Sequence, residues 1–374
     1  MQIPFNKPFL SGKELEYIED AVSKGKISGN GYYTQKCHKF FQERYGFKKC
    51  LLTTSCTDAL EMAAILCDIQ PGDEVIVPSY SFVSTANAFV LRGAKIVFAD
   101  SRKDHPGIDE SKIESLITSR TRVIVPVHYA GVACDMDIIM DIANRHNLMV
   151  VEDAAQAIDS FYKGRPLGGI GHFGCFSFHE TKNIQCGEGG MIVINDERLQ
   201  KRAEIIWEKG TNRAEFFRGE VNKYGWVDIG SSFLPSEITA AFLYAQLENL
   251  DAIQLKRREI WNFYYKFLKP LEIKGQFRIP SIPEFATNNG HLFYIVFRSI
   301  EHRTEIINFL KDNGILSVFH YLSLHKSSFY ENKHDGRELP RSDNYSDCLL
   351  RLPLFYEMTK QETEYIIERI SNIL

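Results

Sequence analysis

The stretch GCFSFHETKN, at residues 174–183, is the starting point for predicting the fold of this chain. Its first half favours a β-strand, and its polar second half favours a bend. A glycine-rich turn follows at residues 187–190, and the apolar residues 191–194 predict a second strand. Lys182 therefore lies between two predicted strands, where ligands of α/β proteins bind. Most lysines lie on solvated surfaces, so the case for Lys182 depends on the rest of the chain.

A regular alternation of strands and helices precedes this stretch. It predicts strands at residues 51–53, 74–78, 94–99, 122–127 and 148–151, and helices at residues 58–67, 84–91, 110–117 and 136–146. Three of the strands are continuous apolar runs, which are typical of strands buried on both faces. We therefore expect a mostly parallel sheet with helices on both of its faces.

The two ends of the chain differ from this central part. Helices are predicted at residues 12–24 and 34–45, and a long helical region at residues 236–268. The chain then predicts strands at 291–297 and 316–320 and helices at 303–313 and 360–374. A length of 374 residues favours about two domains. We expect a large α/β domain over residues 1–240 and a smaller one over residues 241–374, with the N-terminal segment packed on the smaller domain.

The composition excludes several classes of protein. The 44 Lys and Arg against 48 Asp and Glu give a net charge of −4, and no basic run suggests a nucleic acid partner. No apolar stretch reaches the ~20 residues that span a bilayer. The first residues lack an apolar signal core, which predicts a cytoplasmic protein. The eight cysteines are dispersed, without zinc spacing, so we expect reduced thiols and no metal site.

A polar stretch, Thr54-Ser55-Cys56-Thr57-Asp58, lies where a predicted strand gives way to a helix. The free N–H groups and the dipole of a helix start suit a phosphate group. The alternative is an ordinary helix start with Thr57 as the N-cap. The stretch is not a phosphate-binding loop of the GxxxxGK type, and the absence of GxGxxG after the first strand argues against a nicotinamide or flavin site.

Two further strand ends carry candidate residues. Asp153 and Gln156 follow the predicted strand at 148–151, and Phe82 follows the strand at 74–78. Taken singly, Asp153 could cap a helix and Phe82 could belong to the core. Taken together with Lys182, they supply a carboxylate, a flat aromatic surface and a lysine beside a phosphate site. Pyridoxal phosphate chemistry needs this set.

Four segments resemble a known family, the DegT/DnrJ/EryC1/StrS nucleotide-sugar aminotransferases. They are TTSCTDAL at 53–60, PSYSFVSTAN at 78–87, VEDAAQ at 151–156 and FSFHETKN at 176–183. The resemblance implies the fold of the type I pyridoxal phosphate-dependent transferases, similar to aspartate aminotransferase. It also implies a homodimer with active sites at the subunit interface.

The resemblance assigns roles to individual residues. Lys182 would bond to the cofactor and carry the proton, Asp153 would contact the pyridine nitrogen, and Gln156 would lie near the ring hydroxyl. Phe82 would stack on the ring. The phosphate would be held by Thr57, Asp58 and Ser177.

Two departures from the family pattern concern the phosphate. Cys56 stands where members commonly have glycine, and Asp58 stands where they have a small residue, so Asp58 is expected to act through its N–H alone. The segment GSSFL at 230–234 replaces one that reaches the neighbouring subunit, so that Ser232 would take over an asparagine contact. The expected contacts to the sugar nucleotide are Arg213, His320, Tyr321 and His325, for which surface or packing roles are the alternative.

The resemblance further implies the reaction. The amino group of L-glutamate would move to C4 of dTDP-4-dehydro-6-deoxy-D-glucose, giving dTDP-4-amino-4,6-dideoxy-D-galactose and 2-oxoglutarate. Rivals are an enzyme that gives the gluco-configured product and a 3-keto nucleotide-sugar aminotransferase. A sugar 3-dehydratase would have histidine at Lys182. A silent binding protein on this fold is disfavoured by the presence of Lys182, Asp153 and Gln156 together.

Overall fold

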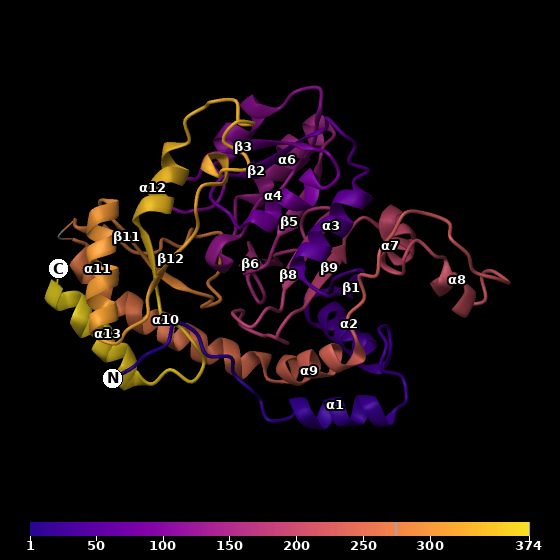
Figure 1. Ribbon diagram of the computed structural model, residues 1–374, viewed down its shortest axis with the longest axis horizontal. Coiled ribbons are helices and arrows are strands. Elements are labelled where there is room, and N and C mark those ends of the chain that lie inside the picture. The colour runs from indigo at the N-terminus through magenta and orange to yellow at the C-terminus, as the bar shows by residue number, and fades with distance from the viewer. Residues whose placement is uncertain (274, 374) are drawn as a thin grey trace.

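The computed structural model describes residues 1–273 and 275–373. These residues form sheets of seven, four and two strands surrounded by helices (Figure 1). The seven-stranded sheet has the order β1-β9-β8-β5-β4-β2-β3, and the four-stranded sheet has the order β10-β11-β13-β12. The two-stranded sheet pairs β6 (Phe161–Tyr162) with β7 (Arg165–Pro166). In the described part of the chain, no helix is both long and apolar enough to cross a membrane.

The seven-stranded sheet is mostly parallel, as the sequence predicts. Its strands are β1 (Cys50–Thr53), β2 (Glu74–Pro78), β3 (Lys95–Ala99), β4 (Thr121–Ile124), β5 (Met149–Asp153), β8 (Phe173–Ser177) and β9 (Gly190–Ile194). Neighbouring strands from β3 through β8 pair in parallel, and β9 runs antiparallel to both β8 and β1. The parallel strands therefore end at one edge of the sheet, where their last residues meet.

Helices cover both faces of this sheet because alternate strand residues point to opposite sides. Val75 and Val77 belong to one core, and Ile76 between them belongs to the other. The core of Val75 includes residues of α3 (Cys56–Leu66), α4 (Val83–Val90) and α7 (Gln200–Trp207). The opposite core includes residues of α2 (Tyr32–Tyr45), α5 (Glu110–Ile113), α6 (Met136–His146) and α9 (Glu237–Glu248). These two cores confirm the predicted α/β class.

The smaller sheet consists of β10 (Phe277–Arg278), β11 (Phe293–Phe297), β12 (Val318–Phe319) and β13 (Leu349–Leu352). One of its faces packs on α11 (Ile300–Asp312), on α13 (Lys360–Ile373) and on the second half of α10 (Leu250–Glu272). On its other face, Tyr294 and Leu349 meet Tyr80 and Tyr129 of the large sheet's loops. This contact brings the smaller sheet over the edge where the parallel strands end.

The hydrophobic cores of the two sheets indicate where the large and the small domain divide. Ala240, Leu243 and Ile253 pack in a core of the seven-stranded sheet, whereas Ile260 begins the core of the smaller sheet. We therefore propose a boundary inside α10 rather than at residue 240. Ile3 forms a bridge with Ile315 of the smaller part, whereas α1 (Glu14–Ser23) and α2 contact α9.

Some elements differ from the sequence-based expectations. Helix α3 begins at Cys56, and its N-cap is Ser55, whose Oγ accepts from the N–H of Asp58 at 3.0 Å. The alternative that Thr57 caps this helix is therefore wrong. The expected helix at 110–117 is α5 followed by a 3-10 turn. The sequence reading did not predict α7, α8 (Arg213–Phe217), α12 (Pro340–Cys348), β10 or β13, nor the 3-10 turns at Tyr129–Gly131, Glu197–Leu199 and Leu324–Lys326.

Candidate active site

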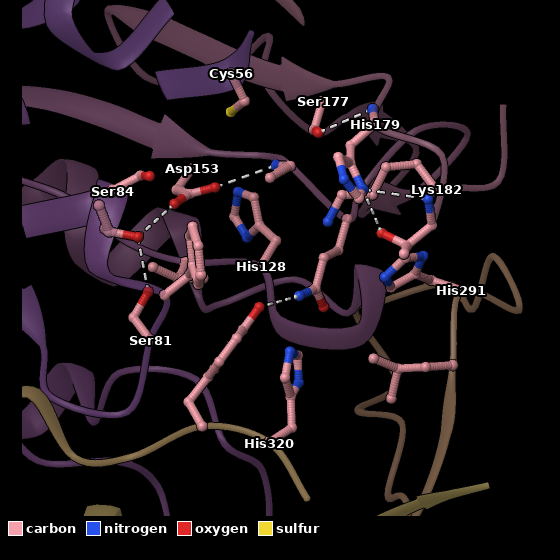
Figure 2. Close-up of a pocket in the computed structure, with 18 of the residues that line it drawn as sticks. Cys56, Ser81, Ser84, His128, Asp153, Ser177, His179, Lys182, His291 and His320 are labelled. Atoms are coloured by element: carbon pink, nitrogen blue, oxygen red, sulfur yellow. Dashed lines mark hydrogen bonds between the residues drawn. The ribbon is translucent and has the colours of Figure 1, made fainter. Parts of the chain in front are cut away.

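A cavity of 420 Å³ lies between the ends of the parallel strands and the smaller sheet. Eight of the residues expected at the site line it, namely Thr57, Phe82, Asp153, Gln156, Ser177, Lys182, His320 and Tyr321. Figure 2 shows Asp153, Ser177 and Lys182 gathered around the same space as His320. Because β5 and β8 are neighbouring parallel strands, with Asp153 opposite Cys175, their ends bring Asp153 and Ser177 to the same edge of the sheet.

Lys182 occupies the bend after β8, where its N–H donates to the carbonyl of His179 at 2.8 Å. Its side chain is half-buried and lines the cavity. Burial lowers the pKa of the Lys182 ammonium, and the nearby positive charge of Arg351 adds to this effect while Asp153 opposes it. A lowered pKa increases the fraction of neutral amine, which is the nucleophilic form.

Asp153 is the last residue of β5, and only 6% of it is exposed. Its Oδ2 accepts from the hydroxyl of Thr85 at 2.7 Å, and its Oδ1 accepts from the N–H of Ala155 at 3.2 Å. Burial raises the pKa of the Asp153 carboxyl, whereas these two hydrogen bonds and the charge of Lys182 lower it. Among the described residues, no cationic side chain forms an ion pair with Asp153. The site thus presents a buried anion that a protonated ring nitrogen would match.

Gln156 lies three residues after Asp153, in the loop that follows β5. Its Oε1 accepts from the N–H of Ala130 at 2.6 Å, and its Nε2 donates to the hydroxyl of Tyr321 at 3.1 Å. Both ends of the amide are therefore oriented. Phe82 lies at the N-terminus of α4 with 55% of its surface exposed, and its ring centre is 5.9 Å from that of Tyr321. Phe82 thus offers a free aromatic face at the cavity wall.

Hydroxyl groups gather at the end of the cavity near α3. Thr57 donates from Oγ1 to the Oγ of Ser84 at 2.8 Å, and Ser177 accepts from the N–H of His179 at 3.3 Å. Gly190 allows the start of α3 to lie against β9, because a Cβ there would be 2.4 Å from the backbone nitrogen of Cys56. A helix start lined by hydroxyls suits a phosphate group.

The structure does not bring four expected residues to the cavity. The carboxylate of Asp58 accepts a hydrogen bond from the hydroxyl of Thr54, and the N–H of Asp58 donates one to the Oγ of Ser55. His325 is buried, with Nδ1 2.7 Å from the Oγ of Ser79. Arg213 is the first residue of α8, which projects from the body of the molecule (Figure 1), and Ser232 forms a bridge with Glu208. Neither residue lines the cavity within this chain.

Three histidines that were given no role from the sequence, His128, His179 and His291, also line the cavity. His128 accepts at Nδ1 from the N–H of Cys134 at 3.3 Å, so its Nε2 carries hydrogen and donates to Glu152 at 2.9 Å. His291 lies 2.8 Å from the amide oxygen of Asn183, and burial lowers the pKa of its imidazole well below the usual range. The strand-end rule that selected Phe82 could have found His128, because it follows the predicted strand at 122–127.

The arrangement fits pyridoxal phosphate. Asp153 can hold a protonated pyridine nitrogen, the Gln156 amide can meet a ring oxygen, and the start of α3 can receive the phosphate. Lys182 supplies the amine, with its pKa lowered by burial. The described residues contain no cluster of histidine, cysteine or carboxylate side chains that could hold a metal ion.

Comparison with known proteins supports this assignment along the whole chain. The model of the DegT/DnrJ/EryC1/StrS aminotransferase family matches residues 9–371. The spore coat polysaccharide biosynthesis protein SpsC of Bacillus subtilis (strain 168) is 32% identical over 385 residues, which cover 100% of this chain and 97% of that protein.

Solved structures show the same relationship. The putative sugar aminotransferase Spr1654 from Streptococcus pneumoniae, in its PMP-form, has a TM-score of 0.91 and 26% identity, covering 100% of this chain and 98% of the other. Its PLP-form has a TM-score of 0.90 and 27% identity, with 100% of both chains covered. The aminotransferase from Psychrobacter cryohalolentis has a TM-score of 0.92 and 27% identity, covering 99% of this chain and 98% of the other. The chain therefore belongs to the DegT/DnrJ/EryC1/StrS aminotransferase family, whose members are pyridoxal phosphate-dependent enzymes.

Proposed function

We propose that this enzyme transfers the amino group of L-glutamate to C4 of dTDP-4-dehydro-6-deoxy-D-glucose. The products are 2-oxoglutarate and dTDP-4-amino-4,6-dideoxy-D-galactose. The specific acceptor is suggested by three segments, PVHYAGVAC at 126–134, EKGTNR at 208–213 and RLPLFY at 351–356. They resemble the dTDP-4-amino-4,6-dideoxygalactose transaminase of enterobacterial common antigen synthesis. The proposed setting is the cytoplasm, with a surface polysaccharide as the destination of the sugar.

The observation that carries the chemistry is that Asp153 and Lys182 line the same cavity. Pyridoxal phosphate, when bound, accepts the amino group of the donor and passes it to the acceptor while its ring delocalises the electron pair. Asp153 would keep the pyridine nitrogen protonated, and the neutral amine of Lys182 would move the proton at the reacting carbon. The Gln156 amide would contact the hydroxyl oxygen of the cofactor ring and so orient the ring. Phe82 would cover one ring face.

The other site assignments belong to the same proposal. Thr57 and Ser177 would hold the phosphate, together with Ser55, which shares the cavity lining near the start of α3. The sugar would meet His320 and Tyr321, which enter the cavity from the loop after β12.

We also propose a homodimer in which the segment of residues 208–234 contacts the second copy. Trp226 is 86% exposed and Phe217 is 70% exposed on this segment, which projects from the body of the molecule (Figure 1). Exposed aromatic side chains of this size favour an interface. Ser232 and Arg213 would then reach the cavity of the partner rather than that of their own chain.

The products of a single incubation test the proposed substrate. The purified enzyme would receive L-glutamate and dTDP-4-dehydro-6-deoxy-D-glucose, and the sugar nucleotide would be analysed by NMR. We expect an axial amine at C4. An equatorial amine would indicate the gluco-configured product. No reaction here, with an amine formed at C3 in a parallel incubation with a 3-keto nucleotide sugar, would indicate the other rival.

A further inference from the structure

His291 lines the cavity, and a buried network of amide side chains fixes the orientation of its ring. The residue lies just before β11, and only 7% of it is exposed. Its Nδ1 is 2.8 Å from the Oδ1 of Asn183, which follows Lys182 in the bend after β8. The chain that enters the smaller sheet is therefore joined through His291 to the bend that carries Lys182.

The direction of this hydrogen bond follows from the partners of Asn183. Its Nδ2 donates to the Oε1 of Gln254 at 2.7 Å and to the carbonyl of Asn289 at 2.9 Å. Gln254 is oriented in turn, because its Nε2 donates to the carbonyl of Ile158 at 3.4 Å. Both amide hydrogens of Asn183 are thus used, and its Oδ1 faces His291 as an acceptor. The Nδ1 of His291 must therefore carry the hydrogen of this contact.

The other ring nitrogen of His291 is consequently an acceptor. Burial lowers the pKa of the imidazole well below its usual range, and the charges of Lys182 and Arg257 add to this effect, so the ring is neutral at pH 7. A neutral imidazole with hydrogen on Nδ1 has a lone pair on Nε2. Among the described residues, none donates a hydrogen bond to this Nε2. It is the nitrogen of His291 that can meet a donor in the cavity.

The amine of Lys182 is a donor in the same cavity. Within residues 1–273 and 275–373, its Nζ forms no hydrogen bond and no ion pair, and only its backbone N–H donates. Figure 2 shows Lys182 and His291 on the same side of the cavity, and the charge of Lys182 lowers the pKa of His291. A donor and an acceptor that both lack partners in a buried place stabilise each other when they pair.

We propose that His291 is a positioning residue for Lys182, whose Nζ donates a hydrogen bond to the Nε2 of His291. The inference rests on the proposed function, in which Lys182 moves the proton, and names the group that orients its amine. A neutral amine has two hydrogens and one lone pair, so a hydrogen held by His291 leaves the lone pair for the reacting carbon. Once Lys182 has taken the proton, the same acceptor stabilises the ammonium.

The proton is accounted for without a change at His291. Lys182 takes the proton from the reacting carbon of the donor and becomes an ammonium, and it becomes an amine again when it delivers this proton to the cofactor. His291 stays neutral throughout, because its lowered pKa makes it too weak a base to hold the proton at neutral pH. His291 therefore affects how firmly Lys182 holds the proton and does not carry it.

Other titratable side chains also face Lys182. Burial lowers the pKa of Lys182, the charges of Cys56 and Asp153 raise it, and the charge of Arg351 lowers it. Further titratable side chains line the cavity, namely His128, His179, Glu188, His320 and Tyr321. A test must keep all of these residues and change His291 alone.

The first measurement uses the full chain without cofactor and compares the parent with His291→Phe and His291→Gln. Phenylalanine keeps a ring but has no acceptor, whereas glutamine offers an amide oxygen. The matched control is His105→Phe, because His105 is also buried, with its pKa lowered to about 4, and does not line the cavity. The rate at which an N-hydroxysuccinimide ester acetylates Lys182, followed by mass spectrometry from neutral to alkaline pH, gives the pKa of the amine.

We expect the pKa of Lys182 to fall by about 1 in His291→Phe, because the ammonium loses an acceptor. His291→Gln should recover part of this fall, and His105→Phe should match the parent. In the holoenzyme, stopped-flow absorbance would follow the cofactor with L-glutamate as the pH is varied. The acid limb of this rate should lie at lower pH in His291→Phe, because a base with a lower pKa stays neutral to lower pH.

Three results would overturn the proposal. They are an unchanged pKa of Lys182 in His291→Phe, an equal fall in His291→Gln, and an equal fall in His105→Phe, which would indicate a general effect of altering a buried histidine. If His291→Phe fails to fold, nitrogen NMR of the parent decides, with the His291 signals assigned from His291→Gln. Hydrogen on Nδ1 supports the proposal, and hydrogen on Nε2 contradicts it.

Failure of the proposed function is distinguishable from failure of this inference. The acetylation and NMR measurements use neither L-glutamate nor a sugar nucleotide, so they report on His291 whatever the substrates are. A parent enzyme that does not react with L-glutamate, together with a lowered pKa of Lys182 in His291→Phe, would contradict only the proposed donor.

Discussion

The carboxylate of Asp153 is held where ionisation is unfavourable without a ligand. Two hydrogen bonds support it, but burial is the largest influence on its pKa and raises it above the usual value. A group with a raised acid pKa stabilises the fold most at low pH, and this stability is lost as pH rises through the pKa of the folded state. The residue therefore costs stability at neutral pH until a cation pairs with it.

A substitution can measure this cost. In cofactor-free protein, Asp153→Asn should melt at a higher temperature than the parent at pH 7, because the asparagine carries no buried charge. The difference should shrink as the pH falls toward 4, where the parent carboxyl takes up its proton. Differential scanning calorimetry at both pH values provides the measurement.

Added pyridoxal phosphate provides the control for this variant. The cofactor should raise the melting temperature of the parent more than that of Asp153→Asn, because only the parent offers an anion to the ring nitrogen. A parent that is more stable than the variant without cofactor at pH 7 would contradict this account of Asp153.

The strands of the large sheet could be predicted from the sequence, but some of the side chains that line the cavity could not. Strands β2, β4 and β5 were predicted because both of their faces are buried, which leaves apolar runs. Strand β13 was not predicted, because Arg351 interrupts a short apolar run and the preceding α12 is largely polar. The strand ends identified Asp153 and Lys182 as candidates.

Which side chains turn toward the cavity could not be predicted from the sequence. Thr57 and Asp58 are neighbours after the same strand end, yet only Thr57 lines the cavity. The carboxylate of Asp58 accepts from the hydroxyl of Thr54, and its N–H donates to the Oγ of the N-cap residue Ser55. His325 lies four residues after Tyr321 but contacts Ser79 instead of the cavity. These orientations depend on packing between distant segments, which a local pattern does not contain.

The close approach of β9 to the start of α3 gives a second prediction. In Gly190→Ala the new Cβ would lie 2.3 Å from the carbonyl carbon of Ser55, so the start of α3 must shift. We expect a loss of about 1–3 kcal/mol in unfolding free energy and weaker cofactor binding. Denaturant unfolding and a cofactor titration give the two values.

Gly225→Ala is the matched control, because a Cβ at Gly225 would meet nothing within 4 Å. Its stability and its affinity for the cofactor should stay close to those of the parent. Equal behaviour of the two variants would show that the contact at Gly190 does not position the helix start.

For the whole molecule, the proposed dimer depends on the projecting segment of residues 208–234. Truncating Trp226 to alanine should raise the dissociation constant of the dimer by at least about tenfold, because large aromatic side chains dominate interface energetics. Analytical ultracentrifugation measures the constant. Ile273→Ala is the control, since Ile273 is 88% exposed but lies at the end of α10. A parent protein that sediments as a monomer would contradict the dimer.

If the cavity is the active site, Lys182 forms a covalent bond with the cofactor. Borohydride would be added to the protein after incubation with pyridoxal phosphate, and the digested protein would be analysed by mass spectrometry. We predict that the peptide that contains Lys182 gains the mass of the reduced cofactor. The corresponding peptide of Lys182→Ala should gain no mass when it is treated in the same way. A cofactor mass on another lysine, or none on the parent protein, would contradict the assignment of this cavity as the active site.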